Sequence, residues 1–356
     1  MIPIKTTRCM VFLLLLSCIT PGQSASTSRL RIGVSGASVS AGFGTGTTLA
    51  HALATAQGRI ADDRLDVSTS LLFMSPQEKS TALLPQLTHE KPTVIIALDQ
   101  LFWFAYGRKE LDQRRRDVTI ALDLLEKLDL PVYVGDVPRM SNVSRMMLPP
   151  ERIPSQDHVD NVNKLIHARC RKLPDFHLLP LASWYESMQN GKTVTVNGSS
   201  VHFKKPELFN SDGLHVNRRG LALITLLIAE SLIENKALKR SAIQMWDVNS
   251  LARHLQGCSL KVRVEDVKGN KVESGEVKLD IAALRKQFVS TDFEKHKKLR
   301  RLLESRDLSS RNPFFIRGLP GALIGKTLTV QCSNQETHSI PVTLKAGANR
   351  AVVTLR

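Results

Sequence analysis

Residues 31–44 read RIGVSGASVSAGFG, and this stretch decides the fold. A short β-prone run, Arg31–Ser35, leads directly into small residues and glycines from Gly36 to Gly44. Glycine tolerates backbone angles that other residues avoid, so such a segment lets the chain turn sharply from a strand toward a helix. In open α/β folds this kind of turn lies at the carboxyl edge of a parallel sheet, where ligands bind. We therefore predict a parallel-sheet fold with Ser38 at its ligand-binding edge.

Beyond this stretch the chain alternates short β-rich runs with amphipathic stretches, which is typical of βαβ units. We expect strands over Arg31–Ser35, Leu65–Phe73, Thr93–Leu98, Pro131–Asp136 and Phe176–Leu179. We expect helices over Thr47–Gln57, Lys79–Thr88, Lys109–Leu128, Val159–Arg171 and Arg218–Asn235. The pattern predicts the α/β class with a mainly parallel five-stranded sheet. Within Lys109–Leu128, the run Arg114–Arg116 should be a solvated helix face.

Two further patterns complete the architecture. Asn197-Gly198, between β-prone runs, is a strong hairpin signal. Past about Leu255 the chain changes to a β-rich texture. Its expected strands are Leu260–Val264, Val272–Leu279, Thr327–Gln331, Ile340–Leu344 and Ala351–Leu355, with a basic helix over Ile281–Arg306 between its halves. We predict a main domain over residues 26–240 and a C-terminal β-rich module over residues 256–356 that carries this basic helical insertion.

The N-terminus has the features of an export signal. Lys5 and Arg8 precede the apolar run Cys9–Cys18, which is too short to span a bilayer, and small residues follow up to Ala25. We predict a signal peptide over residues 1–25 and a periplasmic or extracellular protein. Leu15–Cys18 also resembles a lipobox, so Cys18 could carry a lipid anchor.

Composition narrows the class of partner. The formal net charge is +16, and removing Lys5 and Arg8 with the leader leaves 47 basic against 33 acidic residues, or +14. Aromatic residues make up only 5% and no base-stacking motif is present, so we expect no specific nucleic-acid partner. The basic helix could contact a polyanion or a membrane surface. Its candidate residues are Lys297, Lys298, Arg300 and Arg301. Cys258 and Cys332 are either a disulfide pair or two buried thiols.

Two segments far apart carry the chemistry. Ser38 lies in the first turn, and Asp212 and His215 lie three residues apart in the segment SDGLHVNRRG over residues 211–220. A serine hydroxyl becomes a good nucleophile when an imidazole takes its proton, and a carboxylate fixes the tautomer of that imidazole. Each segment alone is commonplace: the first could be a phosphate loop and the second a loop cap.

Together the two segments resemble the first and last sequence blocks of the SGNH hydrolase family, also called GDSL-like lipases and esterases. The first block, Gly-Asp-Ser-x-Ser-x-Gly-[Tyr/Phe]-Gly, reads GASVSAGFG here, and the last, Asp-x-x-His-x-Asn-x-x-Gly, reads DGLHVNRRG. The resemblance covers about Arg31 to Asn235. It implies a three-layer α/β/α sandwich of flavodoxin-like type. It also implies Ser38 as nucleophile, His215 as general base, Asp212 as orienting carboxylate, and no metal or organic cofactor.

The middle blocks depart from the family pattern. Family members supply oxyanion donors from a second-block glycine and a third-block asparagine. Here the second block holds no glycine, and Ala97-Leu98-Asp99-Gln100 places Asp99 in the asparagine position. A charged Asp99 would disfavour an oxyanion, unless it is protonated, points away to cap the next helix, or leaves Gln100 to donate.

The expected activity is hydrolysis of a small-molecule or glycan ester, either a carbohydrate or a lipid O-acyl group, through an acyl-serine intermediate. The alternative is a catalytically weak or silent SGNH-like domain that acts as a binding or envelope protein.

Overall fold

A computed structural model describes residues 30–141, 143–272, 276–280, 306–307, 314–319, 323–334 and 336–354. The helices are α1 (Leu49–Ala56), α2 (Pro76–His89), α3 (Phe102–Ala105), α4 (Leu111–Glu126), α5 (Gln156–Lys172), α6 (Leu181–Gln189), α7 (Lys205–Leu208), α8 (Arg218–Glu234) and α9 (Val248–Leu255). Short 3-10 helices cover Asp63–Leu65, Leu72–Met74, Pro150–Arg152 and Arg240–Ala242. The predicted signal peptide over residues 1–25 lies outside the described residues.

A parallel sheet lies at the centre of the α/β part. Its strands are β1 (Ile32–Val34), β2 (Val94–Ala97), β3 (Val132–Gly135) and β4 (Phe176–Leu179), paired in that order. Every residue of β2 and β3 is buried, as expected for parallel strands covered on both faces. The predicted α/β class with a parallel sheet is confirmed.

The prediction of a strand over Leu65–Phe73 is wrong, because the regular sheet has four strands and not five. This segment runs beside β1 through one parallel bridge, Val34 to Asp66, and through the bond that Thr69 N donates to Gly36 O. The Asp66 carboxylate accepts bonds from the backbone N–H and the hydroxyl of Ser68. Such local bonds compete with a strand ladder. If this irregular segment is counted as the second of five strands in chain order, the spatial order is 2-1-3-4-5, that is, the segment followed by β1, β2, β3 and β4. The strand order therefore reverses between β1 and β2, which is where open α/β sheets bind ligands.

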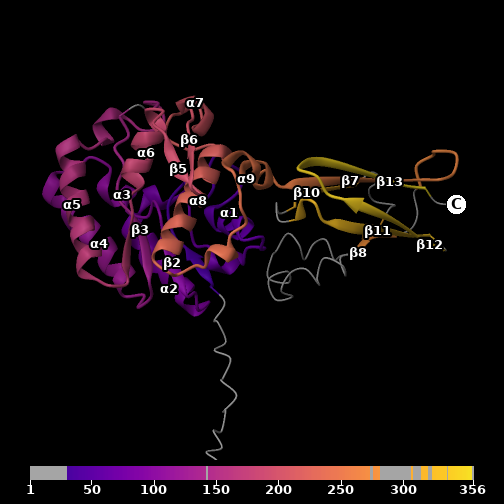
Figure 1. The fold of residues 1–356 in the computed structure, drawn as a ribbon, viewed down its shortest axis with the longest axis horizontal. Helices are drawn as coiled ribbons and strands as arrows, with labels where there is room; N and C mark the ends of the chain where they lie inside the picture. Colours follow the sequence, from indigo (N-terminus) through magenta and orange to yellow (C-terminus); the bar gives the residue numbers. More distant parts are fainter. Residues whose placement is uncertain are drawn as a thin grey trace, which may run out of the picture.

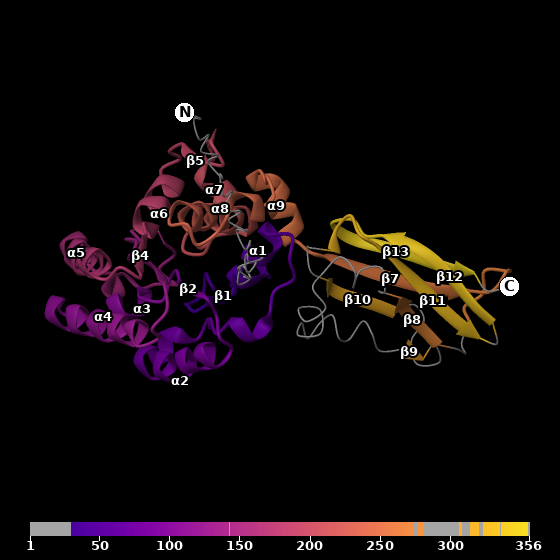
Figure 2. The same ribbon diagram turned by 60° about the horizontal axis from the view of Figure 1, so that its bottom comes forward.

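Helices cover both faces of the sheet. Helices α1, α8 and α9 contact one another on one side, and α4 contacts α2, α3 and α5 on the other. Figure 2 shows these two groups with the strands between them. The predicted core helix is confirmed in α8, where the run from Gly220 to Ala229 is buried throughout.

The prediction that Arg114–Arg116 form a solvated face of α4 is wrong for Arg114. Its side chain is buried and donates to the carbonyl oxygens of Ala105 and Gly107, while Arg115 and Arg116 are exposed. The guanidinium satisfies backbone carbonyls where α3 ends, so this arginine is part of the fold.

The remaining strands are antiparallel pairs with one exception. The Asn197-Gly198 turn joins β5 (Val194–Val196) to β6 (Ser199–Val201), as the dipeptide predicts. The C-terminal strands are β7 (Cys258–Glu265), β8 (Glu276–Asp280), β9 (Arg306–Asp307), β10 (Phe314–Leu319), β11 (Thr327–Asn334), β12 (Glu336–Thr343) and β13 (Gly347–Thr354). They form two sheets, β10-β7-β13, in which β7 and β13 pair in parallel, and β12-β11-β8-β9. Figure 1 shows them beyond α9, to one side of the parallel sheet.

These strands share a second hydrophobic core. Its buried members include Val262, Val330 and Val353, together with Ile60 from the segment after α1. Cys332 is a buried free thiol. The basic helix expected over Ile281–Arg306 lies outside the described residues, apart from Arg306 in β9.

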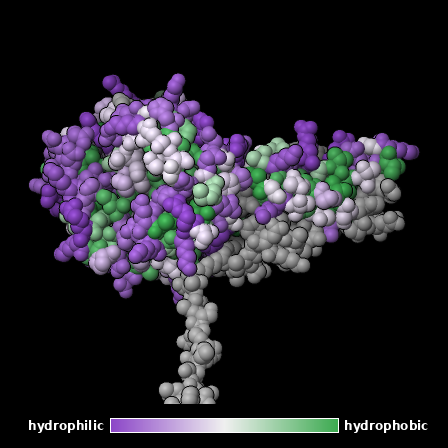
Figure 3. All heavy atoms as spheres, in the orientation of Figure 1, coloured by the Kyte–Doolittle hydropathy of each residue, from purple (hydrophilic) through white to green (hydrophobic). Residues whose placement is uncertain are grey.

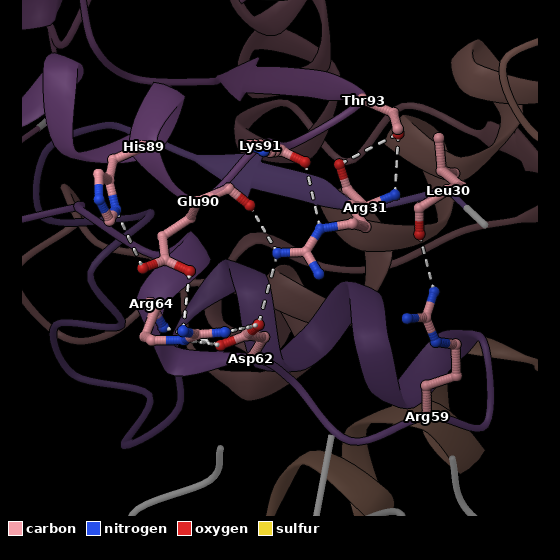
Figure 4. Close-up of polar contacts among 9 residues, drawn as sticks. All are labelled: Leu30, Arg31, Arg59, Asp62, Arg64, His89, Glu90, Lys91 and Thr93. Carbon is pink, nitrogen blue, oxygen red and sulfur yellow. Dashed lines mark hydrogen bonds and ion pairs between the residues drawn. The ribbon is translucent and has the colours of Figure 1, made fainter. Parts of the chain in front are cut away.

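A polar cluster ties the amino edge of the parallel sheet together. Asp62 accepts from Arg64 at 3.2 Å and lies 3.7 Å from the Arg31 guanidinium. Arg31 also donates to the backbone carbonyl of Glu90 at 2.6 Å, at the end of α2. Figure 4 shows these side chains converging from β1, the segment after α1, and the α2–β2 connection. The cluster holds the entry of β1 at the edge opposite Ser38.

Hydrophilic residues predominate on the face of the α/β part drawn in Figure 3, where hydrophobic residues form small separate groups. Within the described chain, we find no helix that combines the length and apolar character needed to cross a bilayer.

Candidate active site

The segment after β1 folds into a tight turn that presents Ser38. Ala41 N donates to Ala37 O, and Phe43 N donates to Ser38 O, both at 2.9 Å. Helix α1 begins later, at Leu49. Residues Gly33–Ser40 are buried except Ser38, which is partly exposed. The turn therefore leaves one hydroxyl accessible at the carboxyl end of β1.

Asp99 holds this turn from behind. Its Oδ1 accepts from Ala37 N at 2.9 Å and from Ser40 Oγ at 2.5 Å, and its Oδ2 accepts from Val39 N at 2.8 Å. A Cβ on Gly36 would lie 2.3 Å from Asp99 Oδ1, so only glycine permits this approach. Asp99 thus points into the turn and binds its backbone. The expected alternative in which it caps the next helix is wrong, because no side chain caps α3.

The backbone N–H of Ser38 differs from those of its neighbours because it does not donate to Asp99. The backbone N–H groups of Ala37, Val39 and Ser40 all donate to Asp99. Among the described residues, no acceptor bonds the Ser38 N–H. It remains available beside the Ser38 hydroxyl.

The loop between α7 and α8 brings His215 and Asp212 to Ser38. His215 Nε2 lies 3.0 Å from Ser38 Oγ, and His215 Nδ1 lies 2.8 Å from Asp212 Oδ2. A carboxylate only accepts, so Nδ1 carries the imidazole proton and Nε2 accepts from the Ser38 hydroxyl. Asn217 caps α8 through bonds from the backbone N–H groups of Arg219 and Gly220, which fixes the end of the loop.

The pKa values of the two carboxylates near Ser38, Asp212 and Asp99, shift in opposite directions. Burial alone would raise the pKa of Asp212, but hydrogen bonds from the His215 side chain and from the N–H groups of His215 and Leu214 lower it overall. Burial raises the pKa of Asp99, and its bonds from Ser40, Val39 and Ala37 only partly oppose that rise. Asp212 is therefore the carboxylate that stays ionised beside the imidazole.

A small pocket opens between Ser38 and His215. Its cavity volume is about 20 Å³, which leaves room for about one water molecule and is far below the roughly 300–1,000 Å³ typical of small-molecule sites. Its lining residues are Ala37, Ser38, Val39, Asp99, Phe102, Pro138, Met140, Leu181, Tyr185, Leu214 and His215. Most of these side chains are apolar, so the pocket suits an apolar group next to the serine.

Gln100 is not brought to this pocket. Its amide oxygen accepts from Ser35 Oγ and its amide nitrogen donates to Ser80 Oγ, both at 2.7 Å, and it is buried. The side chain braces β1 against α2. Asp136 likewise serves the fold, because its carboxylate accepts from Ala182 N at 2.7 Å, at the start of α6, and lies 2.9 Å from His167 Nε2.

Two aromatic residues were not found by sequence reasoning. The Phe43 ring lies 4.4 Å from the His215 ring, centroid to centroid, and Tyr185 lines the pocket from α6. Phe43 belongs to the first block, which was a usable signal. Tyr185 belongs to a plain amphipathic helix and carried no signal.

A second, more polar hollow lies between α5 and α6. It is lined by residues such as Asp136, Arg139, Lys164, His167 and Glu186 and contains none of the predicted catalytic residues. In the described part of the chain, no three His, Cys, Asp or Glu side chains are grouped so as to hold a metal ion.

Comparison with known proteins finds similar solved structures but no match in sequence. No family model and no curated protein matches the chain in sequence. A candidate acylhydrolase from Bacteroides fragilis is similar in structure, with a TM-score of 0.38 and 12% identity over 58% of this chain and 88% of that one. A gut microbial diltiazem-metabolizing enzyme has a TM-score of 0.38 and 10% identity over 57% of this chain, which spans 46% of that enzyme. Likeness at this level says nothing about a reaction, so function must be inferred from the site.

Proposed function

We propose that this chain is an SGNH-type serine hydrolase that cleaves an ester through an acyl-serine intermediate. The observation that carries the proposal is the alignment of Ser38 Oγ, His215 and Asp212 through contacts of 3.0 and 2.8 Å. These distances are those of a nucleophile, a general base and its orienting carboxylate.

In the proposed reaction His215 Nε2 takes the proton of Ser38 as Oγ attacks the ester carbonyl. The tetrahedral intermediate then collapses, and His215 gives the proton to the departing alcohol. A water molecule, deprotonated by the same imidazole, attacks the acyl-serine and releases the acid. Asp212 keeps the proton on Nδ1 and stabilises the imidazolium in both halves.

The orientation of Asp99 supports a working enzyme over the silent binding domain. A carboxylate that filled the oxyanion position unpaired would favour the silent domain. Asp99 instead accepts bonds from the turn that carries Ser38, so its oxygens are engaged on the side of the backbone. The Ser38 N–H remains free to bind an oxyanion.

The surroundings of the site favour an apolar ester over a glycan ester. Phe43, against His215, is 45% exposed, and Phe73 is 49% exposed. Phe73 packs on Trp103 at 5.8 Å between ring centroids, and Trp103 packs on Phe102, which lines the pocket. Packed aromatic rings thus link the exposed Phe73 to the lining of the pocket, which favours the lipid O-acyl alternative.

Export and surface attachment remain proposals from the sequence. We infer a periplasmic or extracellular enzyme, with a lipid anchor at Cys18 or a soluble form as alternatives. Contact with a polyanion or a membrane through Lys297, Lys298, Arg300 and Arg301 would weaken steeply with added salt.

The test is turnover of p-nitrophenyl acetate and p-nitrophenyl octanoate by the wild-type protein and by Ser38→Ala. We expect both esters to be hydrolysed, the octanoate with the lower KM, and neither to be hydrolysed above background by the variant. Equal rates in the two proteins would remove Ser38 as the nucleophile.

A further inference from the structure

The hydroxyl of Tyr185 is buried beside the Ser38 pocket without a partner. Tyr185 is 2% exposed, and its Oη has no hydrogen-bond partner among the described residues. Buried polar atoms in folded proteins nearly always have one, because an unsatisfied hydroxyl destabilises the fold. Because Tyr185 also lines the Ser38 pocket, a bound ligand can supply the partner that its hydroxyl lacks.

Helix α6 holds the Tyr185 ring in a fixed position. Leu181, Tyr185 and Met188 form its buried face, at the spacing of one helical stripe. The bond from Ala182 N to Asp136 fixes the first turn of the helix. The Tyr185 ring also packs edge-on against Phe209, with 5.5 Å between centroids. The phenol is therefore preorganised and cannot turn to a new partner at low cost.

Charge around the phenol keeps it a hydrogen-bond donor. Burial raises the pKa of Tyr185 most strongly, and the nearby carboxylates of Asp99 and Asp212 raise it further. Asp99 lies behind Ser38 and Asp212 lies behind His215. The negative charges of these two carboxylates thus both raise the pKa of the phenol, and the hydroxyl retains its proton.

The pocket needs such a donor. When Ser38 attacks a carbonyl, the carbonyl oxygen becomes an anion that requires hydrogen bonds in addition to the Ser38 N–H. Asp99 can only accept in its ionised form, and the Gln100 amide is engaged by Ser35 and Ser80. Apart from Ser38 and His215, the pocket lining contains one neutral side chain with an O–H or N–H group, Tyr185.

We propose that Tyr185 is a catalytic residue whose Oη–H donates a hydrogen bond to the oxyanion, replacing the donors that the altered middle blocks lack. The inference rests on the function proposed above. As the bond from Ser38 Oγ to the carbonyl carbon forms, the π electron pair moves to the carbonyl oxygen and the serine proton moves to His215. Tyr185 stabilises that negative charge and keeps its own proton. When the carbonyl re-forms, the bond to the alcohol breaks and the alcohol takes the proton from His215.

The variant Tyr185→Phe removes the hydroxyl and leaves the ring. Tyr133→Phe is the matched control, because Tyr133 is fully buried in β3, has an unpartnered Oη, and does not line the pocket. For Tyr185→Phe we expect kcat to fall about 100-fold, as for loss of one oxyanion donor, with KM nearly unchanged. The melting temperature should stay equal or rise, because an unsatisfied hydroxyl is gone. Tyr133→Phe should behave alike in melting but keep its kcat.

The outcomes separate this inference from the proposed function. If Ser38→Ala abolishes turnover while Tyr185→Phe retains the wild-type kcat, the Tyr185 assignment is overturned and the hydrolase stands. If kcat falls only in proportion to a lower melting temperature, or falls equally in Tyr133→Phe, Tyr185 has a structural role and the inference is wrong. Turnover that survives Ser38→Ala overturns the proposed function itself.

Discussion

Replacing Asp99 with asparagine tests the role of this carboxylate as the support of the serine turn. Its two oxygens accept four bonds, from Ala37 N, Val39 N, Ser40 N and Ser40 Oγ. Asparagine has one acceptor oxygen, so in either amide orientation its NH₂ group faces N–H or O–H donors. The turn would therefore lose about two of its four hydrogen bonds to residue 99, and the new NH₂ group would face another hydrogen-bond donor.

The magnitude follows from those contacts. A net hydrogen bond stabilises a fold by about 0.5–1.5 kcal/mol, two bonds are lost, and a donor left unsatisfied costs about 1–3 kcal/mol more. Part of this loss is offset because a neutral amide is less costly to bury than a carboxylate, so we expect a net loss of about 2–4 kcal/mol. A displacement of Ser38 by about 1 Å can lower the rate about 100-fold, so kcat should fall at least about 10-fold.

The loss should also depend on pH. Burial raises the pKa of Asp99 in the folded protein, so the folded state binds more protons than the unfolded state above about pH 3.9. The contribution of Asp99 to stability is fully present below that pH and declines as pH rises through the raised folded value. Because asparagine does not titrate, the advantage of the wild-type protein over Asp99→Asn should shrink from pH 4 to pH 8.

The assay is urea unfolding and ester turnover of Asp99→Asn across this pH range. Asp62→Asn is the control, because Asp62 is also a buried carboxylate, held by Arg31 and Arg64 at the opposite edge of the sheet. It should lose stability and keep its kcat. A more active Asp99→Asn would refute the reasoning, since an asparagine that restores activity must act as the oxyanion donor that the aspartate displaced.

Two further substitutions probe the same geometry. Asp212→Asn should lower kcat by about 10⁴-fold, because an amide favours the wrong imidazole tautomer; steady-state kinetics measures this, and a fall below 10-fold would exclude Asp212 as the orienting group. Gly36→Ala places a Cβ 2.3 Å from Asp99 Oδ1, so we expect a loss of about 1–3 kcal/mol in thermal melts and slower labelling of Ser38 by a fluorophosphonate. Wild-type stability in Gly36→Ala would contradict the close contact.

Local patterns predicted the parts of the fold that depend on burial and turns. The apolar runs of β2 and β3 and the alternating helices predicted a parallel sheet, which the structure has. The expected helix Lys79–Thr88 lies within α2, Pro76–His89, and the Asn197-Gly198 turn lies where its dipeptide predicts. These features follow from residues close together in the chain.

What escaped prediction depends on partners distant in sequence. Arg114 is buried because two loop carbonyls need donors. Sequence placed Asp99 at the sheet edge but could not say that it turns toward the Ser38 backbone. Tyr185 resembles any core residue of an amphipathic helix, and its isolated hydroxyl is evident only once the loops after β1, β3 and α7 close around it.

The most direct test of the account is the site of covalent labelling. After reaction with a fluorophosphonate, digestion and mass spectrometry should find one adduct on Ser38, lost in Ser38→Ala and strongly reduced in His215→Ala. An adduct on a different serine, with Ser38 unmodified and ester turnover intact, would contradict it.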